Sequence, residues 1–293
     1  MFYIQGREIR RVDANGEERT LARYPDGQMT TFTHVSADGK QLCVPTTDEF
    51  ALDGRNMLTG KPDYNIDDRV QQAGLSSFLR VYDTNTGKEI LCEEVEKCWI
   101  THVQFNPVDS DLILYNHEWP ADEGIRRMWL FDGDKHLRLR TEGQGRSRTD
   151  WTCHEMWERD GSSIIYHGGF ADGDPYIGRV KPDGTSIQEI SLKTGCYRYG
   201  HFTVGDPNVL VTDGYYEEEG DKDTWGGDWI CRLDVDWDKS DIQWSPLCRN
   251  SSSWKSQDAH PHPIIDHSSH FAYFTSDMEG KIAAYRIHLQ PSY

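Results

Sequence analysis

The chain has 293 residues and carries 49 acidic residues against 31 Lys and Arg, a formal net charge of −18 at pH 7. Such an acidic chain is a poor candidate for wrapping nucleic acid or for binding an anionic membrane surface. No apolar run approaches the ~20 residues that a membrane-spanning helix needs, and an aromatic content of 12% argues against a disordered chain.

The seven cysteines are scattered along the chain and form no Cys-x-x-Cys pair. Their odd number and their spacing favour neither a disulfide framework nor a zinc finger. A reducing compartment is the simplest interpretation and no secretory signal is visible. We therefore expect a cytoplasmic protein.

A hairpin pattern recurs from the start of the chain onwards. Its first copy has strands over 2–5, 8–13 and 19–23, with a turn at Asn15-Gly16. The clearest later copy covers 78–89, and weaker copies begin near 128, 176, 229 and 282. A strand followed by an Asn-Gly or Thr-Gly turn and a second strand is typical of a β-hairpin.

Between the hairpins lies a second recurring unit, in which a His precedes a short apolar run, a turn and another apolar strand. The histidines that open these units are His34, His102, His154, His201 and His260. A four-stranded unit that recurs roughly every 40–50 residues is typical of a β-propeller blade. The longer intervals in this chain predict insertions, for which we assign 48–73 and 215–227.

No long stretch has the hydrophobic period of a helix, so we expect an all-β chain that forms a β-propeller. Its start supplies three strands of a blade without the His strand, and its end supplies three strands without a fourth. Four full blades lie between. We expect residues 1–293 to form a single propeller domain that is N-terminally incomplete, unless the two termini complete one shared blade.

The repeated His stands at the start of the innermost strand of each blade. In a propeller these starts surround the central channel, so we expect the histidines to approach one axis. The alternative is that individual histidines only bond to backbone groups of their own repeat.

The stretch Gln257-x-x-His260-Pro261-His262-Pro263 offers three potential metal ligands. On an extended strand residues i and i+2 point the same way, so His260 and His262 would project together. Gln257 could fold back from the preceding loop. Imidazole and amide ligands suit Mn, Fe, Co, Ni or Zn and argue against calcium, which takes mostly oxygen ligands.

Several segments resemble the oligogalacturonate lyases, a family of seven-bladed propellers that bind manganese. The segments are 116–120, 127–130, 153–157, 200–201, 252–254, 257–263 and 275–280. Their order and spacing match over essentially the whole chain. Trp119 departs from the pattern, since the family usually has Gly there. Family members carry about two further blades before the equivalent of Met1, which is why we expect an incomplete ring.

The resemblance implies a role for individual residues. His201, Gln257, His260 and His262 resemble the ligands of the manganese ion, which could be another divalent transition metal. His154 resembles the general base and Arg127 the cation that binds the substrate carboxylate beside it. His117 would lie near the sugar. Among the tryptophans, Trp119 and Trp254 are the candidates for stacking on sugar rings.

The implied reaction is β-elimination of short or unsaturated oligogalacturonides, such as digalacturonate, to keto-deoxyuronate products. The partner is thus a small acidic oligosaccharide, and the oligomeric state is open. Elimination removes the weakly acidic C5 proton, so charge that spreads onto the C6 carboxylate must be offset by a metal or an Arg. A His, with an ordinary pKa of ~6.5, suits the base.

Two other functions fit the same sequence. One is a non-catalytic propeller that binds a carbohydrate or a protein and uses the metal as a structural pin. The other is a lyase for a different uronate. The pair Arg127 and His154 favours catalysis, because a structural metal site needs neither of them.

Overall fold

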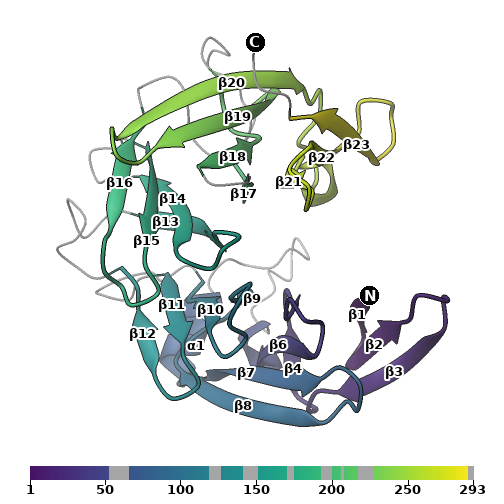
Figure 1. Ribbon diagram of the computed structural model, residues 1–293. Coiled ribbons are helices and arrows are strands. Elements are labelled where there is room, and N and C mark those ends of the chain that lie inside the picture. Colours follow the sequence, from purple (N-terminus) through teal and green to yellow (C-terminus); the bar gives the residue numbers. More distant parts are fainter. Residues whose placement is uncertain are drawn as a thin grey trace. The chain divides into compact units, whose positions relative to one another are not determined.

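The computed structural model of the chain describes residues 1–52, 66–118, 127–140, 151–169, 175–192, 200–205, 208–216 and 227–289 (Figure 1). Antiparallel strands dominate this part of the chain. The chain divides into two compact units, Met1–Thr141 and Glu142–Tyr293, and each is described by itself. Among the described residues, no helix has both the length and the apolar character needed to cross a membrane.

The described residues of the first unit form three antiparallel sheets. The first sheet consists of β1 (Phe2–Gln5), β2 (Glu8–Val12) and β3 (Glu18–Arg23). The second contains β4 (Gln28–Thr30), β6 (Gln41–Asp48), β7 (Ser76–Asp83) and β8 (Glu89–Glu96), with β5 (His34–Val35) also paired to β6. The third runs β9 (Val103–Phe105), β10 (Ile113–Asn116), β11 (Met128–Phe131) and β12 (His136–Arg138).

Three further antiparallel sheets are formed by the part of the second unit that the structure describes. Two have four strands each: β13 (Trp151–Trp157), β14 (Ile164–Gly169), β15 (Pro175–Val180) and β16 (Gln188–Ser191), then β17 (Phe202–Val204), β18 (Val209–Thr212), β19 (Trp229–Asp236) and β20 (Asp241–Arg249). The last has three: β21 (Ile264–Ile265), β22 (Phe271–Ser276) and β23 (Ala283–His288).

Consecutive sheets within a unit pack face to face through apolar side chains. Leu79 of β7 shares one buried cluster with Phe105 of β9 and Ile113 of β10. In the second unit, Ile177 of β15 and Leu210 of β18 belong to another. Because full burial of such a side chain contributes roughly 1.5–3 kcal/mol, these cores hold successive sheets together. The first strands of neighbouring sheets are then in contact, β13 with β17 and β17 with β21.

The predicted all-β propeller is confirmed, down to the strand count of the partial blades. The first and last sheets have three strands each, and the sheets between them have four or five. The described part of the chain forms six such sheets. The single-domain organisation over 1–293 stays a prediction.

The described ends of the 48–73 insertion contain short helices that the sequence analysis did not assign. The insertion begins with the short 3₁₀ helix η1 (Glu49–Leu52) and ends with α1 (Ile66–Ala73), whose Val70 packs on Ala51. Eight residues give little more than two turns, too few for a helical period to stand out in the sequence. The acidic run at 217–219 in the second insertion lies outside the described residues.

Candidate metal and catalytic site

Three histidines from two consecutive sheets meet in the second unit. They are His201, which directly precedes β17, and His260 and His262, which precede β21. One potential ligand atom from each lies within 4.8 Å of those of the other two. The ring centroids of His201 and His262 are 3.8 Å apart, and each lies 5.7 Å from that of His260. The predicted convergence of these side chains is therefore present within this unit.

The backbone brings His260 and His262 together by a different route from the one expected. A short 3₁₀ helix, η2 (Gln257–Ala259), leads into His260, and β21 starts only at Ile264. The predicted strand over the pair is wrong, since His262 has a positive φ of 43°. A left-handed conformation costs a non-glycine residue about 1–2 kcal/mol, and a hydrogen bond of 3.0 Å from the His262 N–H to Asp213 Oδ2 offsets part of that cost.

Gln257 reaches the same place from η2. Its side-chain Nε2 lies 3.5 Å from His262 Nε2. The oxygen and nitrogen of an amide are assigned by their neighbours, so a half-turn of the group presents Oε1 to the same imidazole. The four residues that the sequence proposes as ligands thus converge.

A buried carboxylate that sequence reasoning missed orients the cluster. Asp213 directly follows β18 and is fully buried. It accepts hydrogen bonds from the His201 backbone N–H at 2.6 Å and from His201 Nδ1 at 2.9 Å, as well as from the His262 N–H. A carboxylate that fixes the proton on one ring nitrogen leaves the other free for a metal. The available signal was an acidic residue at the end of an apolar strand.

The donor set fits a divalent transition metal. Burial, followed by the charge of His201, lowers the pKa values of both His260 and His262, with Asp213 acting in the opposite direction. Both imidazoles are therefore neutral ligands near pH 7. Among the described residues, His260 Nδ1 is a buried atom without a hydrogen-bond partner. An unsatisfied buried nitrogen costs about 1–3 kcal/mol, which ligation of a cation at this imidazole would offset.

His154 lies beside this cluster because of a bulge in β13. The register of β13 against β14 shifts between Cys153 and Met156, and His154 has a φ of 50°. Its ring centroid is 4.9 Å from that of His201. Its Nδ1 is 3.0 Å from the Gly200 carbonyl oxygen. The same Nδ1 lies 2.7 Å from His167 Nε2. A carbonyl only accepts, so the tautomer with the proton on Nδ1 is the one that satisfies the contact to Gly200, and in that tautomer Nε2 carries the lone pair.

Arg127 belongs to the first unit, where it pairs with a buried carboxylate. Its Nη1 is 2.9 Å from Glu118 Oε1, and both side chains are buried. Glu118 also accepts hydrogen bonds from Asn116 and from the Thr101 hydroxyl. Burial alone would raise the pKa of Glu118, but His102, Arg127 and Thr101 bring it down to about 2. The predicted position of Arg127 beside His154 stays a prediction.

The three predicted sugar contacts differ in what the structure describes. His117 is 8% exposed and stacks on Trp129 at 4.7 Å, and burial followed by the charge of His136 lowers its pKa to about 4. Trp254 is 6% exposed and its ring centroid is 4.9 Å from that of His260, so it packs against the ligands rather than presenting an open face. Trp119 lies outside the described residues. Their contacts to a sugar stay predictions.

A family model described as oligogalacturonate lyase matches residues 1–293. The chain belongs to the oligogalacturonate lyase family. An oligogalacturonide lyase of Pectobacterium atrosepticum is 27% identical over an alignment of 305 positions that covers 97% of this chain and 73% of that protein. An oligogalacturonate lyase of Dickeya dadantii is 26% identical over 208 residues, 65% of this chain and 50% of that one.

Solved structures agree with the fold of the oligogalacturonate lyase family. An oligogalacturonate lyase in complex with manganese superposes with a TM-score of 0.78 at 23% identity, covering 99% of this chain and 73% of that one. The β-propeller domain of the trilobed protease from Pyrococcus furiosus gives a TM-score of 0.53 at 8% identity, covering 92% of this chain and 70% of that one. The resemblance named from the sequence is confirmed: this is a propeller of a lyase family.

Proposed function

We propose that the chain is a metal-dependent lyase that cleaves short oligogalacturonides by β-elimination. The observation that carries the proposal is the pairing of two features in one unit: a cluster of three imidazoles, and a fourth His held beside it by a strand bulge. A fold alone does not specify chemistry, whereas this pairing has a catalytic use. The proposal takes the family's substrate class as that of this chain.

His201, His260, His262 and Gln257 would hold the metal, and manganese is the first choice because the related oligogalacturonate lyase structure contains it. When bound, the ion supplies Lewis-acid stabilisation of the charge that spreads onto the C6 carboxylate. Three imidazoles and an amide carry no net charge, so the full positive charge of the ion is available to an anionic sugar.

His154 would accept the C5 proton through Nε2. With its proton on Nδ1, facing the Gly200 carbonyl, the imidazole would need no tautomer change before it acts. A general base of this kind contributes typically 10²–10⁴-fold to the rate. Its closeness to His201 would place the reacting carbon between the base and the ligand cluster.

Arg127 would bind the C6 carboxylate. A guanidinium can present two parallel N–H donors to one carboxylate, which fixes the sugar and offsets charge at once. Glu118 would keep the guanidinium plane fixed through their 2.9 Å contact. His117 and Trp119 remain the proposed sugar contacts. Trp254, which packs against His260, remains a third proposed sugar contact.

The non-catalytic alternative explains less. A structural metal pin would account for the cluster and for Asp213, but it would give no reason for a bulge that turns His154 towards the ligands. A lyase for another uronate would need the same base and the same carboxylate clamp, so only a substrate panel separates it. The expected cytoplasmic location rests on the scattered cysteines and stays a prediction.

The test is an assay of digalacturonate turnover by the purified chain with Mn²⁺. Turnover is measured from the absorbance of the unsaturated or keto product. We expect product with Mn²⁺, none after chelation, and none from His260→Ala, which should also lose metal by elemental analysis. The lyase proposal is overturned if the metal-loaded chain binds digalacturonate in calorimetry yet forms no product from any uronide in the panel.

A further inference from the structure

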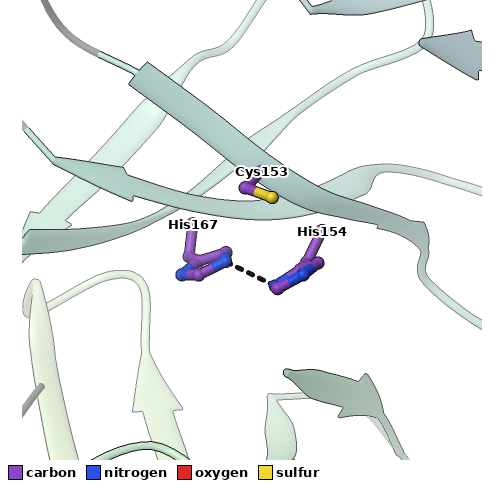
Figure 2. Close-up of side chains that lie close together, drawn as sticks. All are labelled: Cys153, His154 and His167. Atoms are coloured by element: carbon purple, nitrogen blue, oxygen red, sulfur yellow. Dashed lines mark hydrogen bonds between the residues drawn. The ribbon is translucent and has the colours of Figure 1, made fainter. Parts of the chain in front are cut away.

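A second set of potential metal ligands lies in the second unit. It consists of Cys153, His154 and His167, whose ligand atoms all lie within 4.8 Å of one another (Figure 2). Cys153 of β13 and His167 of β14 are register partners across the two strands. Directly opposite residues of an antiparallel pair share one face of the sheet, so these two side chains start on the same side.

His154 joins them only because β13 is bulged. Neighbouring residues on a regular strand point to opposite faces, which would separate His154 from Cys153. The register shift and the φ of 50° at His154 cancel that alternation. His154 Nδ1 then lies 2.7 Å from His167 Nε2, and the two rings are nearly parallel, with an interplanar angle of 10°.

The cluster is built into the sheet. His167 is 0% exposed and meets the ring of Phe202 edge-on, at a centroid distance of 5.6 Å. Cys153 and His154 are half-buried, so solvent reaches one side of the cluster. One thiol and two imidazoles on paired strands give three ligands and an open fourth position, the arrangement of many zinc sites that also bind a water or a substrate.

We propose that Cys153, His154 and His167 bind one thiophilic divalent cation of the zinc class, and that this cation inhibits the lyase. Thiolate ligands select soft cations, whereas the set formed by His201, Gln257, His260 and His262 has no sulfur. The two sites therefore differ in the metals that they prefer. The inhibitory part rests on the proposed role of His154, and the binding part does not.

The inhibition follows from the tautomer of His154. Ligation through Nδ1 displaces the proton that Nδ1 donates to the Gly200 carbonyl. The neutral ring then carries its proton on Nε2, so that nitrogen no longer has a lone pair for the C5 proton. With Zn–N bonds of ~2.0–2.1 Å, tetrahedral nitrogen ligands sit about 3.3 Å apart, so the two rings need to part by only about half an ångström.

Cobalt titration of the metal-free full chain tests the binding part. Co²⁺ bound to a thiolate gives an intense near-ultraviolet charge-transfer band that nitrogen and oxygen ligands do not give. We expect this band in the wild type and in Cys248→Ser, a matched control in which another half-buried cysteine is replaced. Cys153→Ser should lose the band while it still binds cobalt at the other site. The proposal is overturned if the wild type gives no band, or if Cys153→Ser keeps it.

A second measurement serves if Cys153→Ser does not fold. Zinc should slow alkylation of Cys153 in the native wild type, as read by peptide mass, and leave alkylation of Cys248 unchanged. Equal rates at Cys153 with and without zinc would contradict the site.

Turnover of the Mn²⁺-loaded enzyme tests the inhibition. Zinc should halve turnover of the wild type at a concentration at least about tenfold below that needed for Cys153→Ser, because the thiolate is the softest ligand. Equal sensitivity of the two proteins overturns the inhibitory role. If the chain has no lyase activity, the proposed function is wrong. The cobalt band would still decide separately whether the cation binds at Cys153, His154 and His167.

Discussion

The histidines at equivalent repeat positions behave differently in the two units. In the first unit, His34 Nδ1 accepts the Phe105 N–H at 3.1 Å, and His102 Nδ1 lies 2.7 Å from the Thr101 hydroxyl. In the second unit, the rings of His154 and His260 lie 4.9 and 5.7 Å from that of His201. One repeat position therefore supports either a structural hydrogen bond or a ligand, and the neighbouring groups decide which.

The buried acidic residues of the two units also have different partners. In the first unit Glu118 forms an ion pair with Arg127, and His102 Nδ1 is 3.6 Å from its other oxygen. In the second, Asp213 bonds to Nδ1 of His201, so Nε2 is the ring nitrogen of His201 that is left for a metal. Glu118 thus holds a buried guanidinium in place, whereas Asp213 holds an imidazole in an orientation suited to metal ligation.

The largest difference between the two units is expected when the proposed base, His154, is replaced. We expect His154→Ala to lower kcat by about 10²–10⁴-fold while manganese binding, measured by calorimetry, is retained. The matched variant is His34→Ala, at the same repeat position in the first unit. It should keep its turnover but lose about 1–3 kcal/mol of unfolding free energy, because the Phe105 N–H becomes an unsatisfied donor. Similar losses of turnover in both variants would contradict the assignment of a structural role to His34 and a catalytic role to His154.

A smaller effect is expected at the carboxylate behind the ligands. Asp213→Asn keeps an oxygen that can accept from the His201 backbone but removes the charge. Loss of an outer-shell partner typically weakens metal affinity by 10–100-fold, which isothermal calorimetry with Mn²⁺ would measure. An unchanged affinity would mean that Asp213 serves packing alone.

The ion pair of the first unit predicts a pH dependence. The pKa of Glu118 is lowered from 4.5 to about 2 in the folded chain. A depressed carboxyl pKa contributes stability that is fully present above the unfolded pKa and is lost as pH falls towards the folded one. We expect unfolding free energy to decrease between pH 4.5 and 2, and Glu118→Gln to be less stable at neutral pH and to flatten that decrease. Parallel curves for variant and wild type would refute this.

The smallest effect is expected at His117, whose two ring nitrogens have no partner among the described residues. Its pKa is lowered to about 4, so its stability contribution is lost as pH falls from 6.5 towards 4. His117→Phe keeps the stacking on Trp129 without a buried nitrogen to satisfy, so it should be neutral or stabilising by about 1 kcal/mol at pH 7. Chemical denaturation at pH 7 and pH 5 checks it. A raised KM in this variant would support the predicted sugar contact.

The parts that the sequence predicted well are those written in local patterns. The hairpin strands at 2–5, 8–12 and 18–23 follow from alternation and from the turn at Asn15-Gly16, where Gly16 has a φ of 85°. The convergence of His201 with His260 follows from repeat position, because neighbouring blades place their first strands side by side.

The parts that it missed depend on contacts between segments far apart in the chain. The left-handed φ of His262 needs a hydrogen bond to Asp213, 49 residues away. The bulge at His154 adds a residue to one strand. No glycine or proline occurs there to indicate a bulge in the sequence. Asp213 itself looks like an ordinary acidic residue after a strand until the fold places it under His201.

The hydrogen bonds of Asp213 to two different segments have a consequence for metal exchange. One carboxylate accepts from the backbone N–H groups of both His201 and His262, so the protein itself sets the spacing between these two proposed ligands before any ion binds. Loading and release then require little reordering of the chain. The affinity for an ion would then depend on how well its radius fits this fixed spacing. An ion of unsuitable radius would dissociate faster, without any unfolding of the protein.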